Sequence, residues 1–118
     1  MRDLAPGIVR QRLLVEATFT VDVDEQFVDR FLHGLAHHLG LRTYAEATIV
    51  SPGGSGRAEN EGFDAFLPLI DSGISLYVWT ASRFLACVLF TCKSFDVDRA
   101  IGFIDDTFAT SDRAALEF

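Results

Sequence analysis

Three histidines, which could bind a metal, lie in one short segment of the 118-residue chain. His33, His37 and His38 lie close together, and the spacing of four between the first two places them on one face of a helix. Two imidazoles without a third ligand nearby do not complete a metal centre, so we expect no metal site. Histidines at the surface or the end of a helix are the simpler interpretation.

The possible nucleophiles include two cysteines, Cys87 and Cys92, which lie in the apolar run FLACVLFTC at residues 84–92. If this run is a strand, their odd separation of five residues places them on opposite faces, where they cannot pair with each other. Two cysteines are also too few for a disulfide framework. We therefore expect free thiols, as is usual in a reducing compartment.

A longer pattern combines a serine with aromatic residues. The sequence is LIDSGISLYVWT at residues 69–80, followed by FTC at 90–92 and DVD at 96–98. These motifs resemble those of the small prokaryotic S-adenosylmethionine decarboxylases. That family has a serine-containing strand with Trp-Pro-Glu, then Phe-Thr-Cys, then an Asp-containing turn into a helix. The spacing matches without a gap, and the resemblance extends over residues 12–108.

The resemblance implies a pyruvoyl-dependent lyase of polyamine biosynthesis. In that family the serine attacks the preceding carbonyl, the chain is cut, and a pyruvoyl group remains on the new N-terminus. By position, Ser72 would supply the pyruvoyl cofactor and the bond from Asp71 to Ser72 would be the cleavage site. Cys92 would then reprotonate the decarboxylated carbon. Glu16 and Trp79 are the substrate-binding residues that the resemblance implies.

The chain departs from the family at the residues that activate the serine. Tyr77 replaces the processing histidine, and Asp64 replaces a second processing residue, a serine. A phenol with a pKa of about 10 substitutes poorly for an imidazole with a pKa of about 6.5 in acid–base catalysis. Gly73, Thr80 and Ala81 replace a histidine, a proline and a ligand-binding glutamate. We therefore expect an intact chain, with Tyr77 and Asp64 as the catalytic candidates if cleavage occurs.

Each of these residues also has a structural interpretation. Ser72 is typical of a turn, and Cys92 of a small core residue. Tyr77 and Trp79 share a strand face and could pack between two sheets. The combination of these residues at the family's spacing indicates the fold. It is weaker evidence for the activity than for the fold.

The composition excludes other classes of function. The net charge is −7 and the pI about 4.7, so nucleic acids and anionic membranes are poor partners. No apolar run reaches the roughly 20 residues of a membrane-spanning helix, and the first residues lack the apolar core of a signal peptide. We expect one cytoplasmic domain over residues 1–118.

The periodicity predicts the elements that position the candidate residues. β-branched and aromatic residues predict strands at residues 12–21, 43–50, 63–70, 74–80 and 84–91, with a loop at 51–62. Helical spacing of apolar residues predicts helices at about 25–38, capped by Asp22 or Asp24, and up to about 108, capped by Asp96 or Asp98. The expected fold is an α+β two-layer sandwich, a mainly antiparallel sheet with both helices on one face.

Eleven phenylalanines exceed the need of one small core, so we expect the second sheet face to stack on another copy in a homodimer. Three functions stay open. The first, which we favour, is an unprocessed protein that binds S-adenosylmethionine or a related amino acid, for regulation or for altered lyase chemistry. The second is an active pyruvoyl-dependent decarboxylase of S-adenosylmethionine or another amino acid. The third is an interaction protein with no small-molecule site.

Overall fold

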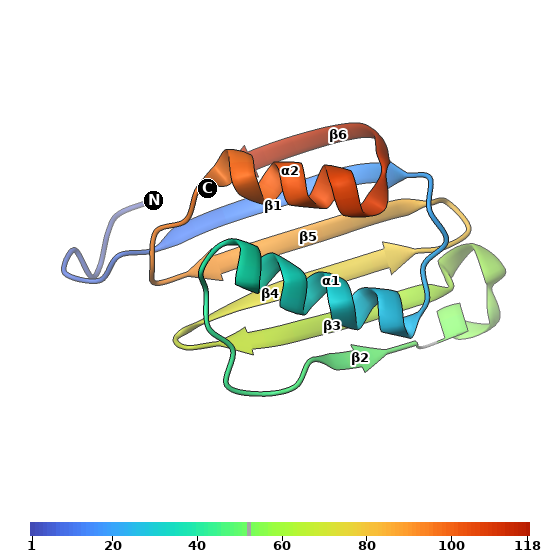
Figure 1. Cartoon of the computed structure of the whole chain (residues 1–118), viewed down its shortest axis with the longest axis horizontal. Coiled ribbons are helices and arrows are strands. Elements are labelled where there is room, and N and C mark those ends of the chain that lie inside the picture. Colours follow the sequence, from blue (N-terminus) through green and yellow to red (C-terminus); the bar gives the residue numbers. More distant parts are fainter. Residues whose placement is uncertain (52) are drawn as a thin grey trace.

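The computed structural model describes residues 1–51 and 53–118, which form a six-stranded sheet with two helices on one face (Figure 1). The helices are α1 (Glu25–His38) and α2 (Val97–Phe108). The strands are β1 (Gln11–Phe19), β2 (Thr48–Val50), β3 (Gly62–Leu69), β4 (Ser72–Trp79), β5 (Phe84–Thr91) and β6 (Thr110–Glu117). Their spatial order is β2-β3-β4-β5-β1-β6, and every neighbouring pair is antiparallel. The two-layer α+β fold expected from the sequence is confirmed.

Side-chain caps begin both helices. The carboxylate of Asp24 accepts a hydrogen bond from the Phe27 amide at 2.7 Å, and Asp96 accepts one from the Arg99 amide at 3.1 Å. Of the two candidates for each helix, Asp24 therefore caps α1 and Asp96 caps α2. Gly40 ends α1 with a φ of 69°, a left-handed conformation that glycine adopts without steric cost. The bounds of α1 are those that the sequence predicts.

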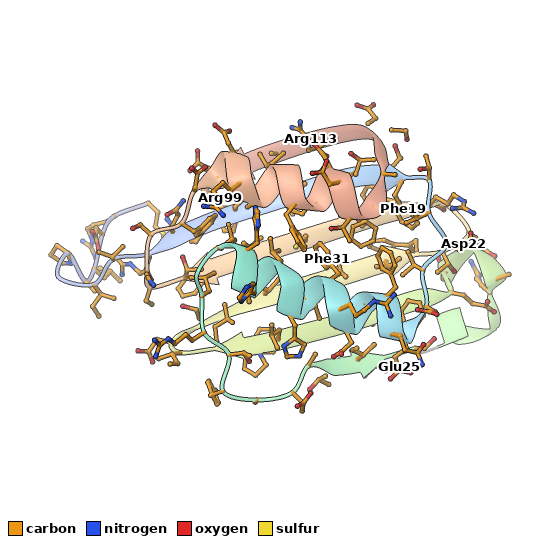
Figure 2. The ribbon with its side chains drawn as sticks, viewed as in Figure 1. Phe19, Asp22, Glu25, Phe31, Arg99 and Arg113 are labelled. Carbon is orange, nitrogen blue, oxygen red and sulfur yellow. The ribbon has the colours of Figure 1, made fainter. Side chains whose placement is uncertain are left out.

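The core lies between the sheet and the two helices. Phe108 is its centre, with ring centroids 5.5, 5.1 and 4.8 Å from those of Phe19, Phe27 and Phe31. Phe31 lies between the two helices over the sheet (Figure 2). Fully burying a side chain of this kind contributes about 1.5–3 kcal/mol, so this cluster is a main source of stability. The other fully buried large side chains are Leu13, Val15, Leu32, Leu35, Leu67, Ile74, Leu76, Leu85, Leu89 and Ile104.

Four of the five predicted strands have different bounds in the structure. β3 begins one residue earlier than predicted and β4 two residues earlier, and each ends one residue earlier. The predicted strand at 43–50 is reduced to β2, and Thr43 makes only a single bridge to Leu69. The Thr43 hydroxyl lies 2.8 Å from the carbonyl oxygens of both Ala45 and Pro68, so a local turn replaces the ladder there. The first strand begins one residue earlier than predicted and ends at Phe19. The predicted loop contains 3₁₀ turns at Gly53–Gly56 and Ala58–Asn60, and its Pro52 lies outside the described residues.

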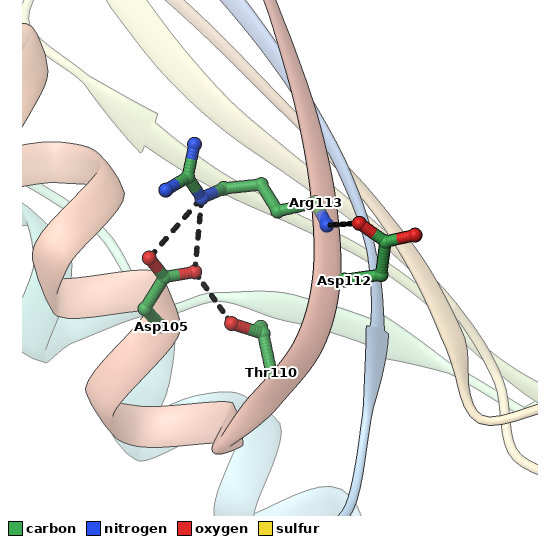
Figure 3. Close-up of polar contacts among 4 residues, drawn as sticks. All are labelled: Asp105, Thr110, Asp112 and Arg113. Carbon is green, nitrogen blue, oxygen red and sulfur yellow. Dashed lines mark hydrogen bonds and ion pairs between the residues drawn. The ribbon is translucent and has the colours of Figure 1, made fainter.

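The sequence analysis missed β6, which adds a strand to the predicted five. Its residues Thr110–Glu117 lack apolar alternation, and none of them is buried. β6 is held in place by backbone pairing with β1 and by side-chain contacts with Asp105 of α2. The Asp105 carboxylate accepts a hydrogen bond from the Thr110 hydroxyl and lies 3.1 and 3.2 Å from Arg113 Nε (Figure 3). Pairing with β1, and not the residue pattern of segment 110–117, therefore determines that this segment is a strand. Across the described ranges, no helix is long and apolar enough to cross a membrane.

Candidate functional site

Ser72 begins β4, directly after a two-residue turn that joins it to β3. The turn residue Asp71 has a φ of 55°, a left-handed conformation that aspartate adopts more readily than most residues. The Ser72 hydroxyl oxygen accepts a hydrogen bond from the backbone amide of Cys92 at 2.9 Å. The structure therefore brings Asp71, Ser72 and Cys92 together at one end of the sheet.

A pocket of about 280 Å³ opens beside Ser72 and Cys92. The cationic residues Arg42 and Lys93 are among those that line it. The Lys93 ammonium donates a hydrogen bond to the Gly40 carbonyl at 3.1 Å. The three histidines of the chain all lie in α1, and none of them is among the described residues that line this pocket. The lining residues are Gly40, Leu41, Arg42, Leu69, Ile70, Asp71, Ser72, Cys92 and Lys93.

Three other candidate residues form a row on the sheet face opposite the helices, which we call the open face. Glu16 in β1 pairs with Ala86 in β5, and Ala86 pairs with Tyr77 in β4. Tyr77 pairs in turn with Asp64 in β3. Directly paired residues share a face, so Tyr77 and Asp64 are neighbours, and Glu16 lies two strand spacings, roughly 10 Å, from Tyr77. Trp79 lies two residues further along β4 on the same face.

The two groups of candidates are separate within one subunit. Ser72 has the parity of Ile74 and Leu76, which are fully buried under the helices, whereas Tyr77 has the opposite parity and is 39% exposed. Five residues of strand also separate Ser72 from Tyr77 by roughly 17 Å. A phenol on the open face therefore does not reach the serine of its own chain.

A second pocket, of about 240 Å³, lies on the open face at Glu16. Phe84 is one of its lining residues, and its ring centroid lies 5.3 Å from that of Trp79. An aromatic pair beside a carboxylate can stack a flat heterocycle and attract a cation. Phe84 and Asp112 were not among the residues predicted from the sequence. An antiparallel pairing of segment 84–91 with segment 12–21 in the observed register would have placed Phe84 near Glu16. The lining residues are Glu16, Ala17, Thr18, Phe84, Asp112, Arg113 and Ala114.

Cys87 belongs to the core and not to either pocket. Its side chain is completely buried, and the apolar surroundings raise the pKa of its thiol to about 12 because the charged thiolate loses its hydration. Cys92 lies just beyond the end of β5 and is half-buried. Both cysteines are free thiols, as expected, and Cys92 lines the pocket beside Ser72.

No protein-family model matches the sequence. No curated protein matches it either. Among solved structures, the chain is similar to the crystal structure of the adenosylmethionine decarboxylase from Aquifex aeolicus VF5. The TM-score is 0.72 and the sequence identity 15%, over 94% of this chain and 89% of that one. At this identity the likeness is one of backbone architecture, and so this chain has the fold of an adenosylmethionine decarboxylase.

Proposed function

We propose that this protein binds S-adenosylmethionine, or a related amino acid, on the open face without converting Ser72 into a pyruvoyl group. The observation that carries the proposal is the Glu16 pocket, where a carboxylate lies beside the Phe84–Trp79 pair. The fold shared with an adenosylmethionine decarboxylase makes this the first ligand to consider.

The chemistry of this pocket suits that ligand. S-adenosylmethionine combines a purine, a ribose and a positively charged sulfonium. The purine can stack on the Trp79 or Phe84 ring, and the Glu16 carboxylate can accept hydrogen bonds from the ribose hydroxyls or the α-amine. The sulfonium would be attracted by aromatic faces and by the carboxylate of Asp112, which also lines the pocket. A neutral nucleoside would lack this last contribution.

The surroundings of Ser72 do not fit a self-cleaving serine. Its attack on the preceding carbonyl needs a group that takes its proton, and the described residues of its pocket include no histidine. Tyr77 and Asp64, at the positions of the processing residues, lie on the other face of the same sheet. We therefore infer no reaction step through a pyruvoyl group in this chain.

A second copy of the chain is the partner that we propose for the open face. Phe66, Tyr77 and Phe90 are 39–43% exposed there, on three neighbouring strands. Large aromatic side chains exposed together on neighbouring strands are typical of an interaction surface, and a twofold axis would pair this surface with itself. Stacking two such sheets would also cover the Glu16 pocket and convert it into a cleft.

Binding can be followed directly because Trp79 is the single tryptophan of the chain. We expect S-adenosylmethionine to change its fluorescence and to release or absorb heat in calorimetry. Glu16→Ala should weaken binding roughly tenfold or more, since a hydrogen bond to a charged group is worth about 1.5–3 kcal/mol. Asp106→Ala, which removes an exposed carboxylate from α2, is the matched control and should bind like the parent.

The outcomes separate the ligand-binding function from the interaction protein. Saturable binding by an intact chain, lost in Glu16→Ala and kept in Asp106→Ala, supports the proposal. Equal binding by both variants places the ligand elsewhere and contradicts the Glu16 pocket. No heat and no fluorescence change, with S-adenosylmethionine or with basic amino acids, leaves the interaction protein as the remaining function.

A further inference from the structure

Three side chains that can bind a metal meet beside α1, and none of them lines either of the two pockets described above. Asp29 and His33 lie one turn apart on α1, and Glu46 comes from the segment just before β2. One ligand atom of each residue lies within 4.8 Å of the ligand atoms of the other two. Asp29 and His33 are half-buried, and Glu46 is exposed. The fold therefore supplies the third ligand that the histidine segment lacks in the sequence.

The spacing of these atoms is close to what a metal ion requires. Zinc binds imidazole nitrogen and carboxylate oxygen at about 2.0–2.2 Å, so ligands of a tetrahedral site lie roughly 3.4 Å from one another. His33 Nε2 and Asp29 Oδ1 are 3.6 Å apart, already within a few tenths of an ångström of that value. A Glu46 carboxylate oxygen lies within 4.8 Å of both atoms, and this exposed side chain has three rotatable bonds through which it can approach them.

The helix that carries two of the ligands is packed on the core, whereas Glu46 comes from a segment that is anchored through the short strand β2. On α1, the buried neighbours Val28 and Leu32 fix the helix against the sheet, and β2 is paired with β3. A groove of about 430 Å³ runs beside Asp29, between α1 and β2. Of the three proposed ligands, Asp29 borders this groove. It is lined by Glu25, Gln26, Asp29, Arg30, Ala47 and Ile49.

We propose that Asp29, His33 and Glu46 bind a divalent transition metal of the zinc type. Two carboxylates and a neutral imidazole carry two negative charges, which balance the charge of the ion. The bound ion would join α1 to the segment that leads into the edge strand β2, whose three residues hold it weakly on their own. Metal that binds only the folded chain stabilises it by mass action, so the ion would act as a structural cross-link.

The main competing arrangement uses the same helix. His37 lies one turn beyond His33, and two imidazoles at this spacing can also share a metal ion. That arrangement needs no tertiary structure and does not involve Glu46. The two sites therefore make opposite predictions for Glu46 and His37.

The test is a calorimetric titration of the full chain with zinc, after chelator treatment, together with thermal unfolding. We expect about one zinc per chain and a higher melting temperature with zinc. Glu46→Gln and Asp29→Asn should each weaken zinc binding at least tenfold and abolish the thermal shift. His37→Gln and Cys92→Ser should bind like the parent, and circular dichroism without metal verifies that each variant is folded.

Several results would overturn the proposal. These are an absence of zinc binding by the parent chain, unchanged binding by a folded Glu46→Gln variant, or loss of binding in His37→Gln. Binding that depends on Cys92 would likewise contradict it. None of these results bears on S-adenosylmethionine, because the Glu16 pocket is on the opposite face of the sheet.

Discussion

The backbone amide of Cys92 donates a hydrogen bond to the hydroxyl of Ser72 at 2.9 Å, across the ends of β5 and β4. The bond holds Ser72 and Cys92, two residues of the sequence motif, next to each other at one end of the sheet. The three histidines of α1 are not among the described residues that line the Ser72 pocket, and the Tyr77 phenol lies on the other face of the sheet. The position of Ser72 beside Cys92 and the activation of a serine for cleavage therefore depend on different residues.

The first prediction concerns processing. Because the described residues around Ser72 provide no imidazole, we expect purified protein to remain one chain of 13.0 kDa. Intact mass spectrometry measures this, and Ser72→Ala should have the same stability to storage as the parent. Fragments of residues 1–71 and 72–118, with a pyruvoyl group on the second, would instead establish the active decarboxylase.

The second prediction concerns the open face. We expect the parent chain to be a dimer by light scattering at micromolar concentration. Phe90→Glu places a charge in the apolar patch and should give a folded monomer, since burying an unpaired carboxylate is costly. Tyr44→Glu is the control, because Tyr44 is 70% exposed in the loop before β2 and lies outside the patch. A monomeric parent, or a dimer unaffected by Phe90→Glu, would contradict this interface.

The third prediction distinguishes the two thiols. Cys92 should react with a thiol reagent in the native state, whereas Cys87 should react only after denaturation. Burial raises the pKa of Cys87 from 9.0 to about 12, so the unfolded chain releases this proton at a lower pH than the folded one. Stability from this group is complete below pH 9 and is lost as the pH rises towards 12.

Denaturant unfolding at pH 8 and pH 10.5 measures the alkaline effect. At the higher pH, Cys87 should lower the free energy of unfolding on the order of 2 kcal/mol. Cys87→Ala should show a smaller difference between the two pH values, even though the lost volume makes it less stable at both. An identical pH dependence in the variant would refute the role of Cys87.

The fourth prediction concerns the junction of α2 and β6. Ala109 has a φ of 48° at the end of α2, where a residue with a Cβ is strained by about 1 kcal/mol. Ala109→Gly should therefore raise the free energy of unfolding by up to about 1 kcal/mol. Ala114→Gly, in the exposed strand β6, should lower it by roughly 0.5–1 kcal/mol. A loss of stability in Ala109→Gly would show that the left-handed conformation is not strained.

Local patterns determined most of the secondary structure. The helical spacing of Val28, Phe31, Leu32 and Leu35 predicts α1, and the caps at its ends are local side-chain and glycine effects. The alternation in β4 likewise predicts that Ile74 and Tyr77 face opposite sides. These features could be predicted because each depends on contacts within a few residues of the chain.

Contacts between distant segments decided the remainder. β6 exists because β1 offers a free backbone edge and Asp105 binds Arg113, neither of which is visible in the residues 110–117 alone. The Glu16 pocket needs β1, β5 and β6 side by side, and Glu46 reaches His33 only because β2 and α1 lie together. The sequence by itself therefore determined the elements and the faces that they present. Only the tertiary structure decided which faces meet, because strand order and register depend on pairing across the whole sheet.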